Sequence, residues 1–174
     1  MLNPRSMETK FKLFGHPVHP MLIVFPLGLL SSAVVFDLLY LATGNEDLAI
    51  FSFWALAAGV IGGLAAAVFG TWDYLAIPEG TRAKRIGLVH GGGNVVVTAL
   101  FAISWLMRRE DPTYLPDNIL PLIVALLGAG IALFTAWLGG ELVYRLRVAV
   151  DDDAGLNASS SLSASGVADV ERPA

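Results

Sequence analysis

Four long apolar stretches dominate the pattern of hydrophobic and polar positions along the chain. They cover residues 21–43, 48–75, 86–107 and 119–143. Each is longer than the ~20 residues that an α-helix needs to cross a hydrocarbon core about 30 Å thick. A helix of a soluble protein would carry a polar stripe at helical period, whereas these stretches are apolar nearly all round. The pattern therefore predicts four transmembrane helices.

Short polar turns separate the four stretches, at 44–47, 78–80 and 111–117. In lipid every backbone polar group must bond within its own helix, so the predicted fold is an all-α four-helix transmembrane bundle with short loops. The last segment is acidic and rich in Ser and Ala, and it lacks the apolar surface needed to fold. We therefore expect a membrane domain over 1–150 and a disordered acidic C-terminal tail over 151–174.

Composition excludes several classes of protein. Hydrophobic residues make up 55% of the 174 residues and charged residues only 15%, and the mean hydropathy is +0.65. The net charge of −4 argues against nucleic acid as a partner. The absence of cysteine rules out disulfides, thiolate iron–sulfur clusters and covalently attached c-type haem.

The distribution of Lys and Arg predicts the orientation, because cytoplasmic loops carry an excess of basic residues. One side of the predicted bundle carries nine of them and the other side only two. The nine are Arg5, Lys10, Lys12, Arg82, Lys84, Arg85, Arg145, Arg147 and Arg172, and the two are Arg108 and Arg109. Both termini are therefore expected on the cytoplasmic side.

Polar residues inside the spans are the candidate functional residues, because each is costly in lipid. The topology places five of them in one layer near the cytoplasmic face: His16, His19, Asp73, His90 and Glu141. His90 would lie ~6 Å deep, with Asn94 on the same helix face. Asp37 lies beyond the midplane and outside this layer.

Local sequence suggests how these residues are held. His16 and His19 each precede a proline, which favours an extended entry segment, and Pro26 permits a kink in the first helix. Glu141 has a possible ion-pair partner in Arg145, four residues later. Asp73 could pair with a basic residue of the following loop, namely Arg82, Lys84 or Arg85.

Glycines recur within the spans, and two interpretations apply to them. Gly59 and Gly63 form a small-x-x-x-small pair that allows close helix packing in lipid. The same role fits the run 91–93, which is the favoured interpretation. The sharper alternative is that this run leaves room for a flat ligand beside His90.

The string from Gly15 to Leu30, GHPVHPMLIVFPLGLL, resembles the opening of the domain-of-unknown-function 2231 family, and Asp37 follows it. The His90 region and the string WLGGELVYR at 137–145 are also similar to that family. The resemblance covers roughly residues 12–150. It implies a bacterial inner-membrane protein with four helices, whose relatives occur beside redox modules such as Rieske-type or cytochrome domains. It implies no established activity.

The first functional hypothesis is a redox-linked membrane protein that binds a cofactor. A divalent transition metal would find a suitable set of imidazole and carboxylate ligands in His16, His19, His90, Asp73 and Glu141. Alternatively, His90 with His16 or His19 would hold a b-type haem, with Asn94 nearby and propionates near Arg82, Lys84 and Arg85. A membrane or redox protein partner would then exchange electrons with the site.

Two further hypotheses stay open. In one, the chain is a non-catalytic structural or assembly protein whose polar layer only fixes helix packing. In the other, it is a small transporter or pore subunit, for which a homo-oligomer would be needed. No nucleophile elbow, phosphate-binding loop or zinc-protease motif is present, so no catalytic residue is assigned.

Overall fold

The computed structural model of the chain describes residues 7–152 and 154–162. Its helices are α1 (Val18–Leu22), α2 (Val24–Thr43), α3 (Glu46–Ala76), α4 (Arg82–Met107) and α5 (Leu120–Gly140), and a π-helical turn, η1 (Glu141–Arg145), continues α5. When α1 is counted with α2, and η1 with α5, the chain has four helical rods that are long and apolar enough to cross a membrane. The predicted all-α four-helix transmembrane bundle is thus confirmed.

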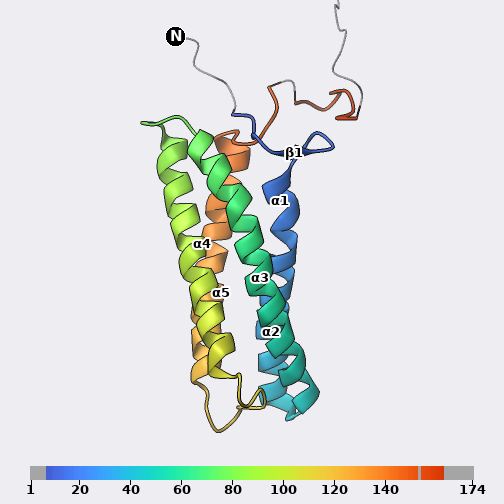
Figure 1. The fold of residues 1–174 in the computed structure, drawn as a ribbon, viewed down its shortest axis with the longest axis vertical. Coiled ribbons are helices and arrows are strands. Elements are labelled where there is room, and N and C mark those ends of the chain that lie inside the picture. Colours follow the sequence, from blue (N-terminus) through green and yellow to red (C-terminus); the bar gives the residue numbers. More distant parts are fainter. Residues whose placement is uncertain (1–6, 153, 163–174) are drawn as a thin grey trace, which may run out of the picture.

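The four rods run alternately up and down (Figure 1). We call one end the terminal end, because 7–17 and 146–152 lie there with the α3–α4 connection at 77–81. The opposite end is the loop end, formed by the α2–α3 turn at 44–45 and the α4–α5 connection at 108–119. The closest packing is between α2 and α3 and between α4 and α5. The bundle is therefore two helical hairpins laid side by side.

Local signals in the sequence fix where the helices begin and end. Gly44 ends α2 with φ of +69°, a left-handed conformation that glycine adopts without strain. Asn45 caps α3 by accepting a hydrogen bond from the Asp47 amide at 3.1 Å. Thr81 caps α4 in the same way, through the Lys84 amide at 3.1 Å.

The N-terminal segment differs from the expected extended entry. His16 lies in β2 (His16–Pro17), which pairs with β1 (Lys12–Leu13) in a small antiparallel hairpin that the sequence did not predict. His19 is helical rather than extended, because α1 already begins at Val18. Pro20 is tolerated there, since its missing N–H belongs to the first turn, where amides have no intrahelical acceptor. The helix is interrupted at Ile23, shortly before Pro26.

Glycines bring the helices of each hairpin close together. A Cβ at Gly59 would lie 2.6 Å from a methyl carbon of Leu30 on α2, and one at Gly93 would lie 2.5 Å from a methyl of Thr135 on α5. By contrast, a Cβ at Gly91 or Gly92 would meet open space. In the run 91–93, therefore, only Gly93 is required for contact between helices.

The segment after η1 returns to the N-terminal segment. The Met7 carbonyl accepts a hydrogen bond from the Ala149 amide at 2.7 Å, and Lys12 forms an ion pair with Asp151. Hydrogen bonds to Asp151 and to Glu8 raise the pKa of Lys12. Residues 154–162 contain no helix or strand. Much of the predicted disordered tail, residue 153 and residues 163–174, lies outside the described residues.

Candidate functional site

His90 lies on the side of α4 that faces α5. Its Nδ1 is 2.8 Å from the Thr135 carbonyl oxygen. A carbonyl oxygen can only accept a hydrogen bond, so Nδ1 must carry the proton and the neutral ring keeps its lone pair on Nε2. The ring also lies against Gly139, where a Cβ would come within 3.1 Å of its Cε1. Two residues of α5 thus fix both the tautomer and the position of this imidazole.

Asn94, one turn further along α4, supports His90. Its amide nitrogen donates to the His90 carbonyl at 2.9 Å and lies 3.3 Å from His90 Nε2. Its amide oxygen accepts from the Thr135 hydroxyl at 3.1 Å. These three residues form one polar unit between α4 and α5.

His19 is held in the same manner on the other hairpin. Its Nδ1 lies 2.9 Å from the Ala66 carbonyl oxygen of α3, so this nitrogen also donates and Nε2 again keeps the lone pair. The ring lies against Gly70, where a Cβ would be 2.8 Å from Cε1. We call His19, His90 and Asn94 the histidine layer.

The hydrophobic core is interrupted at the histidine layer. One buried cluster fills the middle of the bundle around Leu56 and Phe101, and a second, around Leu122, fills the loop end. A third, around Leu142, lies at the terminal end. Along α4, which the structure describes completely, no residue between Gly87 and Val97 is buried. His90 and Asn94 therefore lie on a stretch of α4 that has no buried residue.

The other predicted ligands lie in separate contacts. His16 is exposed on β2, with Nε2 3.2 Å from the Ser161 hydroxyl. Asp73 is buried and accepts a hydrogen bond from the Thr9 hydroxyl, and Glu141 pairs with Arg82 at 2.6 Å. Across the described part of the chain, no three His, Asp or Glu side chains form a group that could hold a metal ion.

Two expected pairings at the terminal end are wrong. Glu141 does not pair with Arg145, because the π-helical turn η1 widens the helix and moves the fourth following residue off its face. Asp73 is bonded to Thr9 from the N-terminal segment rather than to a base of the α3–α4 connection. Among those bases, buried Lys84 donates to the Tyr74 and Ile77 carbonyls at 3.1 and 3.2 Å, which caps the end of α3.

A second polar site, at the loop end, was not predicted. Asp37 of α2 and Arg108, directly after α4, form an ion pair with N–O distances of 2.9 and 3.0 Å, and both side chains are completely buried. The Ser52 and Ser104 hydroxyls lie 3.0 and 2.8 Å from the guanidinium. The guanidinium also stacks on the Tyr114 ring, 4.5 Å from its centre. We call these five residues the charged cluster.

The α4–α5 connection closes over the charged cluster. The Tyr40 hydroxyl lies 2.9 and 2.7 Å from the Thr113 and Leu115 carbonyls, so it bonds the connection to α2. The Tyr114 hydroxyl is buried without a hydrogen-bond partner in the described residues. Burial raises the pKa of Tyr114 well above its ordinary value, and this phenol stays neutral at physiological pH.

A signal for the charged cluster is present in the sequence. Asp37 is a carboxylate in the outer half of the first span, and Arg108 immediately follows the third span. Both spans run toward the loop end, so the two charges reach the same end of the bundle. Sequence reasoning only counted Arg108 among the basic residues of the less basic side, whereas its side chain folds back into the bundle to reach Asp37.

Comparison with known proteins identifies the family. Residues 15–152 match the family described as "Predicted membrane protein (DUF2231)", and the chain belongs to it. The match covers most of the chain, including both histidines of the histidine layer and both members of the buried ion pair. No curated protein and no solved structure matches the chain significantly.

Proposed function

We propose that this DUF2231 protein binds a b-type haem between His19 and His90 and transfers electrons at the membrane. The observation that carries the proposal is that the two imidazoles have the same hydrogen-bonding arrangement. Each donates Nδ1–H to a backbone carbonyl, Ala66 or Thr135, and keeps its lone pair on Nε2. A ligand histidine commonly donates its other ring N–H to a carbonyl or carboxylate in this way, which fixes the tautomer and raises its basicity.

The number of available ligands favours haem over a bare metal ion. A structural or catalytic metal ion takes three or four protein ligands, and the described residues offer no group of three. A haem iron already has four porphyrin nitrogens and needs at most two axial ligands from the protein. Two imidazoles on facing hairpins fit that requirement.

Position and packing give further support. His90 is eight residues from Arg82, where α4 begins, so it lies about 12 Å along the helix axis from that end. This is deeper than the ~6 Å expected from a span starting at residue 86. The layer lies beside a stretch of α4, between Gly87 and Val97, that has no buried residue. Gly70 and Gly139 remove the side chains that would push the rings aside.

Each residue of the layer would have a separate task. Haem supplies reversible one-electron chemistry when it is bound. His19 and His90 would hold the haem iron, and the Ala66 and Thr135 carbonyls would orient them. When the ligand binds, Asn94 would give up its weaker contact with His90 Nε2, at 3.3 Å. It would keep its 2.9 Å hydrogen bond to the His90 carbonyl.

A purely structural or assembly role is the second candidate, and one observation favours it. Both ring nitrogens of His90 already have partners, so His90, Asn94 and Thr135 could serve only to join α4 to α5. A small transporter or pore would require several copies of the chain. Electron transfer, by contrast, would require a redox protein or membrane partner.

We further propose that the terminal end faces the cytoplasm and that the protein lies in a bacterial inner membrane. Arg108 is neutralised by Asp37, so the loop end presents only Arg109 as a free base within the described residues. The terminal end, by contrast, carries Lys10, Lys12, Arg82, Arg85, Arg145 and Arg147.

Cysteine labelling tests this orientation. Single cysteines at Asn45 and Asp117 should react with an impermeant thiol reagent added outside intact cells. Reaction only after lysis would reverse the orientation.

Absorption spectroscopy tests the haem proposal. The full chain is purified in detergent from haem-replete cells, titrated with haemin, and compared with His19→Ala, His90→Ala and His16→Ala. We expect a Soret band in the parent and in His16→Ala, which lacks only an exposed imidazole on β2. The band should be lost or strongly changed in the other two variants. A parent that neither contains nor takes up haem would overturn the proposal.

A further inference from the structure

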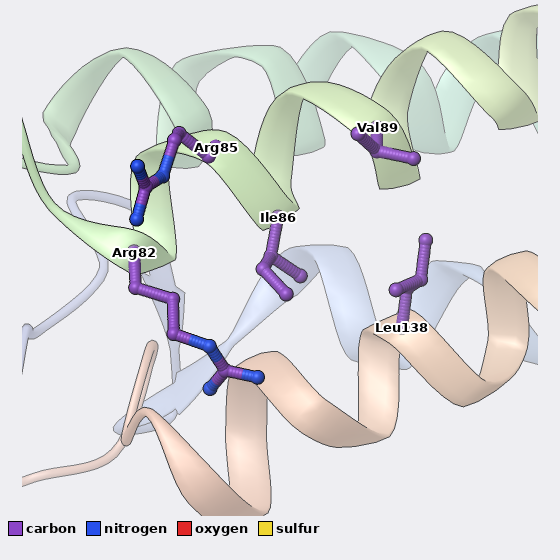
Figure 2. Close-up of a pocket in the computed structure, with 5 residues that line it drawn as sticks. All are labelled: Arg82, Arg85, Ile86, Val89 and Leu138. Carbon is purple, nitrogen blue, oxygen red and sulfur yellow. The ribbon is translucent and has the colours of Figure 1, made fainter.

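We propose that the groove between the start of α4 and the end of α5 binds an anionic phospholipid of the surrounding bilayer. Figure 2 shows the five residues that line it: Arg82, Arg85, Ile86, Val89 and Leu138. The groove is separate from the histidine layer and does not depend on the proposed haem.

The groove has an apolar wall and a basic rim. Ile86 and Val89 of α4 face Leu138 of α5 across it, and both guanidinium groups lie toward the end where α4 begins (Figure 2). Val89 is 52% exposed, so the groove is open at the side of the bundle. In a membrane-spanning bundle this side is covered by lipid rather than by water.

The positions of the groups match the two parts of a phospholipid. Arg82 is the first residue of α4, so the guanidinium groups lie at the membrane–water interface, where lipid phosphates are found. Val89 is seven residues further along, about 10 Å toward the centre of the membrane. A phosphate at the rim would therefore place an acyl chain along the apolar wall.

Charge complementarity selects an anionic lipid. Arg82 is held over the groove by Glu141 at 2.6 Å. Arg85 is exposed, and it has no ion-pair or hydrogen-bond partner for its side chain in the described part of the chain. Basic pockets between transmembrane helices at the cytoplasmic side are typical sites for anionic headgroups. A zwitterionic lipid has no net charge, so it would leave the groove with the net positive charge of Arg85.

Arg85→Gln tests the rim, because it removes the free charge and leaves the Arg82–Glu141 pair intact. Arg109→Gln is the matched control, since Arg109 is an exposed arginine just beyond the other end of α4, in a depression that also contains Glu110. Val89→Trp tests the wall by filling the groove without changing the charge. All three sites are exposed, so the variants should fold.

The measurement is native mass spectrometry of the full chain in detergent, titrated with phosphatidylglycerol or phosphatidylcholine of equal chain length. We expect the parent to bind phosphatidylglycerol more tightly. Arg85→Gln should weaken that binding about fivefold, the effect of one basic residue near an anionic lipid surface. Val89→Trp should weaken binding of both lipids, and Arg109→Gln should change neither. Excess inorganic phosphate should not displace the lipid.

The proposal is overturned if the parent binds both lipids equally, or if Arg85→Gln and Arg109→Gln behave alike. It is also overturned if inorganic phosphate competes fully, since the site would then recognise a free anion. None of these results depends on haem, so they are independent of the outcome of the haem titration.

Discussion

At the loop end of the bundle, the carboxylate of Asp37 faces the guanidinium of Arg108, and two serine hydroxyls and a tyrosine ring complete the cluster. In the histidine layer, each imidazole instead bonds through Nδ1 to a backbone carbonyl of a neighbouring helix. In the charged cluster, the two opposite charges neutralise each other. The histidine layer leaves the Nε2 atom of His90 with only a 3.3 Å contact to Asn94, and the Nε2 atom of His19 has no hydrogen-bond partner in the described residues.

This difference indicates what each region is for. A buried ion pair that is complete stabilises one arrangement of the helices and has little capacity left for a ligand. Two imidazoles whose orientation is fixed through Nδ1 can still gain energy from a ligand at Nε2. Removing residues from the two regions should therefore have different consequences, which the following predictions separate.

The largest loss of stability is expected for Arg108→Met. The change leaves the Asp37 carboxylate buried without its partner, which typically costs about 3–5 kcal/mol. The melting temperature in detergent should fall sharply, while Arg109→Gln, at an exposed arginine, should leave it unchanged. The double variant Asp37→Leu/Arg108→Met should recover much of the loss. A single Arg108→Met variant that melts like the parent would show that the charged cluster does not stabilise the bundle.

An intermediate loss is expected for His90→Ala. It removes the bond to the Thr135 carbonyl and the contact with Asn94, together about 1–3 kcal/mol. Haem binding should disappear at the same time. Asp37→Asn should show the opposite combination, with lower stability and a retained haem spectrum in the molecules that fold. If Asp37→Asn lost haem as readily as His90→Ala, the two regions would not be functionally distinct.

A smaller loss is expected for Tyr40→Phe. The variant keeps the ring and removes the hydroxyl that bonds the α4–α5 connection to α2, at a cost of about 1–2 kcal/mol. Hydrogen exchange should accelerate at residues 113–115 and remain unchanged near His19 and His90. Faster exchange in the histidine layer would mean that the two regions unfold together.

The smallest effect is expected for truncation after Val150. The change removes the half-exposed Lys12–Asp151 ion pair, and surface pairs of this kind contribute about 0–1 kcal/mol. The melting temperature should stay within a degree or two of the parent. A large decrease would show that the segment after residue 150 contributes to the fold. The control is Asp151→Asn, which removes the ion pair alone.

The sequence predicted the helical architecture because hydropathy over a whole span is a strong signal. It also placed His19 and His90 at one depth, with Asn94 on the same helix face as His90, since helix direction and residue spacing determine depth. It could not predict which partner each side chain would choose. Glu141 lies in a π-helical turn and pairs with Arg82. Asp73 accepts a hydrogen bond from Thr9, because the N-terminal segment packs against α3. Such choices depend on the rotation of helices and on connections that have no periodic pattern.

The charged cluster was missed for a related reason. A basic residue just beyond a span is usually solvated, and sequence reasoning only counted Arg108 among the basic residues of the less basic side. In the structure the α4–α5 connection covers it, because the Tyr114 ring stacks on the guanidinium and the Tyr40 hydroxyl bonds to the connection. An isolated carboxylate in a span, such as Asp37, is costly enough to indicate that a buried base exists nearby.

The most direct test of the central claim is the spin state of haem bound to the purified protein, measured by electron paramagnetic resonance. The claim is that His19 and His90 present their Nε2 atoms to the same ligand. It predicts a low-spin ferric signal typical of two imidazole ligands in the parent, which becomes high-spin in His19→Ala and in His90→Ala. A low-spin signal that persists unchanged in both variants, or no bound haem at all, would contradict it.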